Sequence, residues 1–106
     1  MKRLALFVAL TTVTTGLFAA PLVVYSERSE QLIKPLLDTY TAKTGVEIQV
    51  LTDDAAPLIA RLKAEGNRTP ADVLITVDAG NLWHAAESGM LAKVDSPILE
   101  TRVPDY

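Results

Sequence analysis

The chain has 106 residues, of which 49% are hydrophobic and 22% charged, and its formal net charge is -3. That length and composition fit one ordinary globular domain and exclude collagen and charge-rich disorder. The negative balance argues against nucleic acid as a partner, because a protein that binds the phosphate backbone needs a clustered basic surface. The lack of cysteine excludes a catalytic thiolate and any cysteine-ligated zinc or iron-sulfur site.

The first twenty residues differ from the rest of the chain. Lys2 and Arg3 precede an uncharged, largely apolar stretch that ends in two small residues, Ala19 and Ala20. This order is typical of a secretory signal peptide. We therefore expect residues 1–20 to be removed after Ala19 or Ala20 and the product to be periplasmic. A membrane anchor is the alternative interpretation, since about 20 apolar residues can span a bilayer.

After this leader, short β-branched runs alternate with helical patterns, which is typical of βαβ units and a mostly parallel sheet. The expected fold class is therefore α/β, with three layers. In chain order, the sequence predicts a strand at 22–25, a helix at about 29–44, a strand at 46–51, a helix that follows Asp53 or Asp54 and ends at Gly66, a strand at 73–77, a helix at 78–88, and a short helix that begins at Ser96 and stops before Pro104.

Hydrophobic spacing assigns these elements to positions in the fold. The run at 73–77 is almost wholly apolar, which predicts a central strand, whereas the alternation at 46–51 suits a sheet edge. We expect Gly45 to end the first helix and Pro35 to kink or restart it. Recurring apolar residues predict a stripe on the first helix and an inward face on the second: Leu32, Ile33, Leu36, Leu37 and Tyr40, then Leu58, Ile59 and Leu62.

Three parallel strands leave the far edge of the predicted central strand unpaired, and sheets of this design normally continue with further strands. A chain of this length also buries a smaller share of its unfolded surface than a larger domain does. We therefore expect residues 21–106 to be the first part of the amino-terminal lobe of a longer protein.

The segment after the first strand is the clearest candidate for a binding site. In open α/β sheets, ligands bind beyond the carboxyl ends of the strands, where helix amino termini offer free N–H groups to anions. Ser26, Arg28 and Ser29 lie at such a place, and they offer hydroxyl donors and a fork-shaped guanidinium to a small oxyanion. An ordinary helix cap beside a solvated arginine is an equally good interpretation.

Other polar and aromatic residues have structural interpretations. We expect Asp72 to be structural and Asp78 to cap the next helix, while the single histidine, His84, lacks partners for metal or acid-base chemistry. Tyr25 and Tyr40 could bind a hard cation as phenolates, but packing is the expected role of both. The sequence contains no phosphate loop, nucleophile elbow or H-E-x-x-H motif, so we do not expect an enzyme.

Three runs of the sequence are informative when they are read together: VVYSERSEQLIKPLLDTYTAKTG, RTPADVLITVDAGNL and GMLAKVDSPILETRVP. They resemble the start of periplasmic ferric-iron-binding proteins, the substrate-binding components of iron(III) ABC importers. The resemblance covers essentially all of Leu22 to Tyr106. It depends on the combination of Y-S-x-R, P-A-D-V-L-x-T-V-D and L-x-x-x-x-S-x-x-L-E, since no single piece would suffice.

The resemblance implies a type II periplasmic binding fold, in which two α/β lobes close on ferric iron. It also implies an oxyanion such as carbonate in the metal's shell and delivery of the iron to an ABC permease in the inner membrane, and we expect a monomer. In such proteins most protein ligands are tyrosine phenolates of the second lobe, which would lie beyond Tyr106. Fe3+ is a hard ion that suits such anionic oxygen ligands.

The Y-S-x-R match places Ser26 and Arg28 beside the iron or its anion. Two departures from the resemblance leave the first-lobe metal ligands open. Where relatives have a histidine or a histidine-tyrosine pair after this arginine, the chain has Ser29 and Glu30. Where some relatives have a glutamate ligand after the central strand, the chain has a valine followed by Asp78. Ser29, Glu30 and Asp78 are therefore possible first-lobe contacts, and no metal ligand is assigned.

Two alternative functions are compatible with the same fold. The same two-lobe design serves other small solutes, such as sulfate, molybdate and polyamines. The effector domain of a transcription regulator can also share this fold. The leader at residues 1–20, in place of a DNA-binding helix-turn-helix, argues against the regulator.

Overall fold

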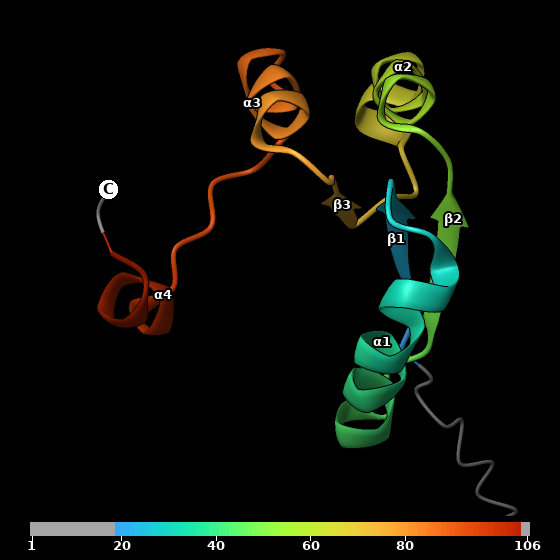
Figure 1. Cartoon of the computed structure of the whole chain (residues 1–106), viewed down its shortest axis with the longest axis vertical. Coiled ribbons are helices and arrows are strands. Elements are labelled where there is room, and N and C mark those ends of the chain that lie inside the picture. Colours follow the sequence, from blue (N-terminus) through green and yellow to red (C-terminus); the bar gives the residue numbers. More distant parts are fainter. Residues whose placement is uncertain (1–18, 105–106) are drawn as a thin grey trace, which may run out of the picture.

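The computed structural model describes residues 19–104 (Figure 1). The expected signal peptide lies outside these residues except for Ala19 and Ala20, which are exposed and precede the first strand. Every strand and helix predicted from the sequence is present, and a short 3-10 helix is added. In chain order the elements are β1 (Leu22–Ser26), α1 (Glu30–Thr44), β2 (Ile48–Thr52), α2 (Ala55–Glu65), the 3-10 helix η1 (Gly66–Arg68), β3 (Val73–Ile75), α3 (Ala79–Glu87) and α4 (Pro97–Arg102).

The strands form one parallel sheet in the order β2-β1-β3. Tyr25 of β1 pairs with Leu51 of β2 on one side and with Leu74 of β3 on the other. The edge position predicted for β2 is confirmed. Among the described strands β1 is central and β3 lies at the other edge, so the central position predicted for the run 73–77 is not met within residues 19–104. An apolar run indicates that the side chains of a strand are buried, but it does not predict which strands pair with it.

Helices lie on both faces of the sheet, which confirms the predicted three-layer α/β class. On one face, Tyr25 of β1 packs with Leu58 and Leu62 of α2, and Leu51 and Leu74 of the flanking strands surround them. The three strand residues share a face because they are aligned across the sheet. The predicted inward face of α2 is therefore confirmed.

α1 lies on the opposite face, against the edge strand β2 (Figure 1). Its Leu37 lines a hollow together with Ile48 and Val50 of β2. Those two strand residues alternate with Leu51, so their side chains point away from α2. β3 has less cover on this face, and Val73 is 39% exposed.

The predicted apolar stripe of α1 is only partly buried. Ile33 is buried, but Leu32 and Leu36 are 68% and 69% exposed. Tyr40 is 47% exposed, so the expectation that it packs in a core is wrong for the described chain. The reason is the position of the helix: α1 lies over an edge strand, so only one side of it meets the sheet.

The two residues singled out in α1 differ in outcome. Gly45 ends the helix with a left-handed backbone (φ 74°), and its N–H donates to the carbonyl of Thr41 at 2.8 Å, which confirms the prediction. The helix continues through Pro35, so the predicted restart is wrong, while the alternative of a kink stays a prediction. A proline removes one main-chain hydrogen bond, and the turns on both sides are sufficient to keep the helix in one piece.

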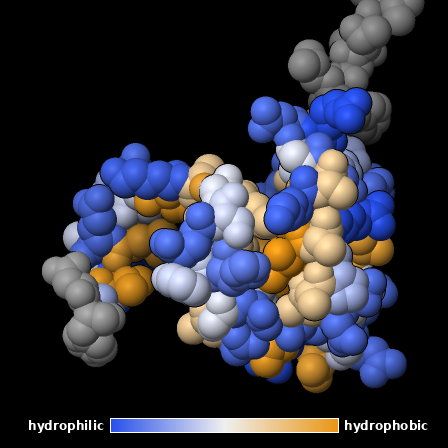
Figure 2. Space-filling view, turned by 90° about the horizontal axis from the view of Figure 1, so that it is seen from above, coloured by the Kyte–Doolittle hydropathy of each residue, from blue (hydrophilic) through white to orange (hydrophobic). Residues whose placement is uncertain are grey.

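The last two helices are less enclosed than the first two. α3 contacts α2, and Ala85 is its buried residue. α4 stands apart from the sheet in Figure 1, and its Ile98 and Leu99 are exposed. Figure 2 shows hydrophobic surface at this end of the molecule.

Within residues 19–104, no helix is both long enough and apolar enough to cross a membrane.

Candidate functional site

The carboxyl ends of the three strands meet at one edge of the sheet, because all three run parallel. β1 ends at Ser26, β2 at Thr52 and β3 at Ile75. Main-chain hydrogen bonds join these ends: Asp53 N donates to Ser26 O at 3.2 Å, and Glu27 N donates to Ile75 O at 2.8 Å. The loops after the strands therefore form one continuous rim.

The strand order creates a switch point on this rim. The chain passes from β1 to β2 on one side and then crosses to β3 on the other side of β1. In open α/β sheets such a reversal opens a crevice beyond the carboxyl ends of the two strands, and ligands bind there. The loop from Ser26 to Ser29 and the loop from Thr76 to Asp78 border this position.

Ser26 shapes the first of these loops. Its side chain is fully buried, and its Oγ accepts a hydrogen bond from the N–H of Arg28 at 3.0 Å and donates one to the carbonyl of Arg28 at 2.9 Å. The single hydroxyl proton is therefore committed to the protein main chain. Ser26 holds the loop that carries Arg28, and its predicted contact with an anion stays a prediction.

Arg28 and Ser29 present polar groups to solvent on the rim. Both are exposed, and the Arg28 guanidinium makes no hydrogen bond or ion pair with any described residue. Ser29 precedes α1 as its N-cap residue, but its hydroxyl makes no capping hydrogen bond. The N–H groups of Glu30 and Gln31 at the start of α1 also lack a described partner, whereas that of Leu32 donates to Ser29 O at 3.0 Å. A guanidinium, a hydroxyl and such N–H groups are the donors that bind small oxyanions.

The two candidate carboxylates differ in how much of their hydrogen-bonding capacity is used. Asp78 caps α3, as the sequence predicts: Oδ1 accepts from Asn81 N at 2.8 Å and Oδ2 accepts from Asn81 Nδ2 at 2.7 Å. Glu30 is exposed in the first turn of α1 and accepts no hydrogen bond from the described residues. Of the two, Glu30 has the freer oxygens.

Glu27 is a site residue that the sequence analysis does not identify. Its side chain is half-buried, and its Oε2 accepts a hydrogen bond from the N–H of Val77 at 2.7 Å. The bond joins the loop after β1 to the loop after β3, fifty residues further along the chain. The only signal in the sequence is an acidic residue next to the end of a strand, and this is too common to predict a bridge.

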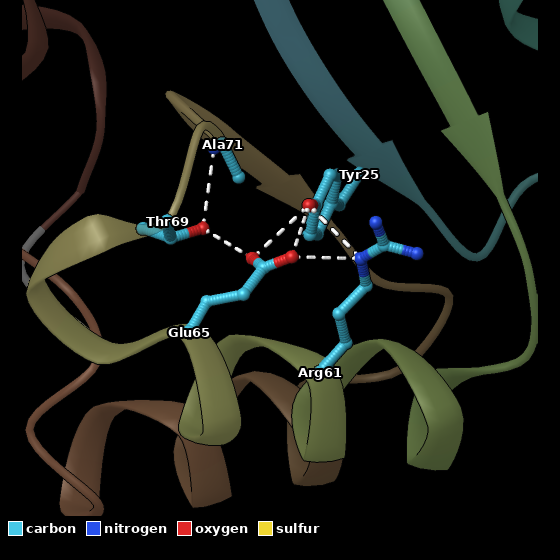
Figure 3. A network of polar contacts seen from close by, with 5 residues as sticks. All are labelled: Tyr25, Arg61, Glu65, Thr69 and Ala71. Atoms are coloured by element: carbon cyan, nitrogen blue, oxygen red, sulfur yellow. Dashed lines mark hydrogen bonds and ion pairs between the residues drawn. The ribbon is translucent and has the colours of Figure 1, made fainter.

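Tyr25 extends from β1 toward α2, where a polar network surrounds its hydroxyl (Figure 3). The hydroxyl donates to the carboxylate of Glu65, with 3.0 Å to each oxygen. Arg61 Nε donates to Glu65 Oε1 at 2.8 Å and to the Tyr25 hydroxyl at 3.2 Å. The Thr69 hydroxyl donates to Glu65 Oε2 at 2.7 Å and accepts from Ala71 N at 3.2 Å. The network ties α2 and the following loop to β1.

This network gives Tyr25 a structural role. The side chain is 2% exposed, and the Arg61 guanidinium lies over its ring, 5.6 Å from the centroid. The pKa of the Glu65 carboxyl lies below its ordinary value because the carboxylate accepts hydrogen bonds. The bond from Thr69 has the largest effect, followed by those from Arg61 and Tyr25. The predicted packing role of Tyr25 is confirmed.

The predicted structural role of Asp72 is also confirmed, since its Oδ2 accepts from Val23 N at 2.9 Å.

The described part of the chain does not form a complete metal site by itself. Within residues 19–104, no group of three or more histidine, aspartate and glutamate side chains converges closely enough to hold a metal ion. His84 is exposed on α3.

Comparison with known proteins adds to this geometry. No protein-family model matches the chain. Iron uptake protein A1 of Synechocystis is 44% identical over 82 residues, an alignment that covers 77% of this chain and 23% of that protein. The structure of a Trichodesmium protein in complex with iron and citrate aligns with a TM-score of 0.74 at 39% identity, over 80% of this chain and 27% of that one. Apo ferric ion-binding protein A of Pasteurella haemolytica aligns with the same TM-score at 36% identity, over 82% and 27%.

The chain is a relative of bacterial ferric-iron-binding proteins. This finding confirms the resemblance inferred from the sequence, and the structural alignments confirm the α/β fold of the type II periplasmic binding proteins. The names of these ferric-iron-binding relatives describe binding and uptake proteins and not enzymes. The chain spans about a quarter of the length of the relatives that it matches.

Proposed function

We propose that residues 21–106 form part of the first lobe of a periplasmic protein that binds ferric iron with an oxyanion and delivers the iron to an ABC permease. The observation that carries the proposal is the Arg28 guanidinium, which is exposed at the switch point of the sheet without a described partner. The supporting comparison is the 44% identity with an iron uptake protein over 82 residues.

In this proposal the rim of the first lobe holds the anion. Arg28 supplies two parallel donors and a positive charge, and the Ser29 hydroxyl and the first N–H groups of α1 add neutral donors. Ser26 contributes indirectly, because its hydroxyl holds the backbone of Arg28. Among the candidate first-lobe contacts to iron, Glu30 ranks above Asp78, because both oxygens of Asp78 accept from Asn81. It ranks above Ser29 because Fe3+ prefers anionic oxygens to a neutral hydroxyl.

The charges of the expected groups support an anion site in the first lobe and phenolate ligands in a second lobe. Fe3+ suits anionic oxygen ligands, and tyrosine phenolates from a second lobe would supply them. Several phenolates and a carbonate gathered at one ion repel each other, so a nearby guanidinium lowers the free energy of the assembled site. The oxyanion is carbonate in our proposal, while the related Trichodesmium structure contains citrate.

The decisive experiment is a ferric iron titration of the exported protein that carries this sequence, in bicarbonate and, separately, in citrate. We expect a phenolate-to-iron charge-transfer band in the visible range. Arg28→Gln should weaken iron binding about tenfold, because a charge-assisted hydrogen bond to the anion is lost. The matched control is Arg68→Gln, which alters an exposed arginine in η1, away from the rim, and should leave the affinity unchanged.

Each outcome has a defined meaning. A wild-type protein that gives no band, or that binds sulfate, molybdate or a polyamine instead, contradicts the iron assignment. Equal losses in the two arginine variants contradict the role of Arg28 and leave the iron assignment intact. The mass of the protein recovered from the periplasm tests the leader, which we expect to be cleaved after Ala19 or Ala20.

A further inference from the structure

We propose that Glu27 is a positioning residue that clamps the loop after β3 to the loop after β1 and thereby fixes the two loops relative to each other at the switch point of the sheet. The inference rests on the proposed function, because the switch point is the place where we expect the anion and the iron to bind. Glu27 was not among the site candidates of the sequence analysis.

Two hydrogen bonds attach Glu27 to the end of β3. Its main-chain N–H donates to the carbonyl of Ile75 at 2.8 Å, as a continuation of the parallel ladder. Its carboxylate Oε2 accepts the N–H of Val77 at 2.7 Å. β3 ends at Ile75, so at Val77 a side chain replaces the main-chain partner that a longer strand would have. A carboxylate is a strong acceptor for such an N–H, and the short distance agrees with a charge-assisted bond.

The position of this bond gives it a consequence for the site. Arg28 directly follows Glu27, and Asp78, which caps α3, directly follows Val77. The Glu27 bond therefore fixes the start of α3 relative to the backbone of Arg28 across the switch point. Without it, the N–H of Val77 has no described acceptor, and the loop from Thr76 to Asp78 is free to move away from β1.

A direct contact between Glu27 and the cargo is the competing interpretation. Oε1 accepts no hydrogen bond from the described residues, so it has capacity for a ligand. The two roles differ in what they require of the side chain. A clamp requires an acceptor oxygen of the right reach, which glutamine also has, whereas an iron ligand requires the negative charge.

The test uses Glu27→Ala and Glu27→Gln in the exported protein that carries this sequence. We expect Glu27→Ala to weaken ferric iron binding about tenfold and Glu27→Gln to weaken it about threefold or less, because the amide oxygen still accepts the Val77 N–H. The control is Glu47→Ala, which removes an exposed carboxylate before β2, at the other end of the strands.

Amide hydrogen exchange of Val77 provides a readout that does not depend on iron. We expect this amide to exchange faster in Glu27→Ala than in the wild type and to stay protected in Glu27→Gln. Wild-type iron affinity in Glu27→Ala overturns the proposal, and so does an equally large loss in both variants, which would mark Glu27 as a ligand. If the wild type binds no iron, the proposed function fails, while the Val77 exchange rates still decide whether Glu27 is the clamp.

Discussion

The two faces of the sheet carry similar apolar patterns and bury them very differently. On the α2 face, Leu58 is 1% exposed and packs directly on Tyr25 of the central strand. On the α1 face, Leu36 is 69% exposed although its spacing in the sequence is equally regular. The difference comes from what lies beneath each helix: α2 covers the middle of the sheet, and α1 covers its edge. Helical periodicity predicts which side of a helix is apolar, and it does not predict how much of that side is covered.

The largest expected difference between the faces is in how much the free energy of unfolding falls when a leucine is replaced by alanine. Leu58→Ala should lower the free energy of unfolding of the chain by about 3 kcal/mol, because it removes buried methyl groups and leaves a cavity. Leu36→Ala should change it by no more than about 0.5 kcal/mol. Urea denaturation followed by circular dichroism measures both. Similar costs for the two substitutions would show that the faces are equally buried in solution.

A longer protein should reduce this contrast. If residues 21–106 form part of a lobe, the exposed stripe of α1 becomes covered when the rest of the lobe is present. Leu36→Ala should then cost about 2 kcal/mol in a protein of the relatives' length. The same urea experiment on the longer protein measures this cost. A cost near zero there would argue against burial of α1 by additional chain.

The polar network on the α2 face should contribute less than the leucines. Tyr25→Phe keeps the ring against Leu58 and Leu62 and removes one hydroxyl, so we expect a loss of about 1 kcal/mol in the free energy of unfolding. Tyr40→Phe is the matched control on the α1 face and should have almost no effect, since Tyr40 is half exposed. Equal effects of the two substitutions would indicate that the Glu65 contact adds no stability.

The smallest expected effect is a pH dependence confined to the α2 face. Because the folded-state pKa of Glu65 is lowered, its contacts stabilise the fold above the ordinary carboxyl pKa of about 4.3 and are lost as the pH falls through the lowered value. Glu65→Gln should therefore be less stable than the wild type at neutral pH and approach it in acid. Thermal unfolding from pH 7 down to about 3 measures this. A constant difference across the range would contradict a charge-dependent contact.

Local features of the fold were predictable from the sequence, and long-range ones were not. The β-branched run of β1, the glycine at position 45 and the capping aspartate before α3 each carry their signal within a few residues. The central position of β1 depends on pairing with segments more than twenty residues away, which no local pattern encodes. The same holds for the contact of Tyr25 with Glu65, forty residues apart.

The features of the candidate site also separate into local ones, which the sequence predicts, and long-range ones, which it does not. The strand-turn-helix pattern placed Ser26 and Arg28 at the end of the first strand, where the structure has them, because a polar turn between a strand and a helix is a local signal. The contact with iron or its anion that the Y-S-x-R motif implies stays a prediction. That the Ser26 hydroxyl would be used by the main chain, and that Glu27 would reach Val77, follow from backbone geometry that only the assembled sheet provides.

The position of β3 has a practical consequence for work with this chain. A strand whose outer N–H and C=O groups have no described partner is a template for another strand, and the 39% exposed Val73 adds an apolar surface beside it. We therefore expect samples of the isolated polypeptide to self-associate through edge-to-edge pairing at high concentration. A lysine placed at position 73 is a simple way to make such samples more soluble, since a charged side chain at a sheet edge discourages a second molecule from adding to it.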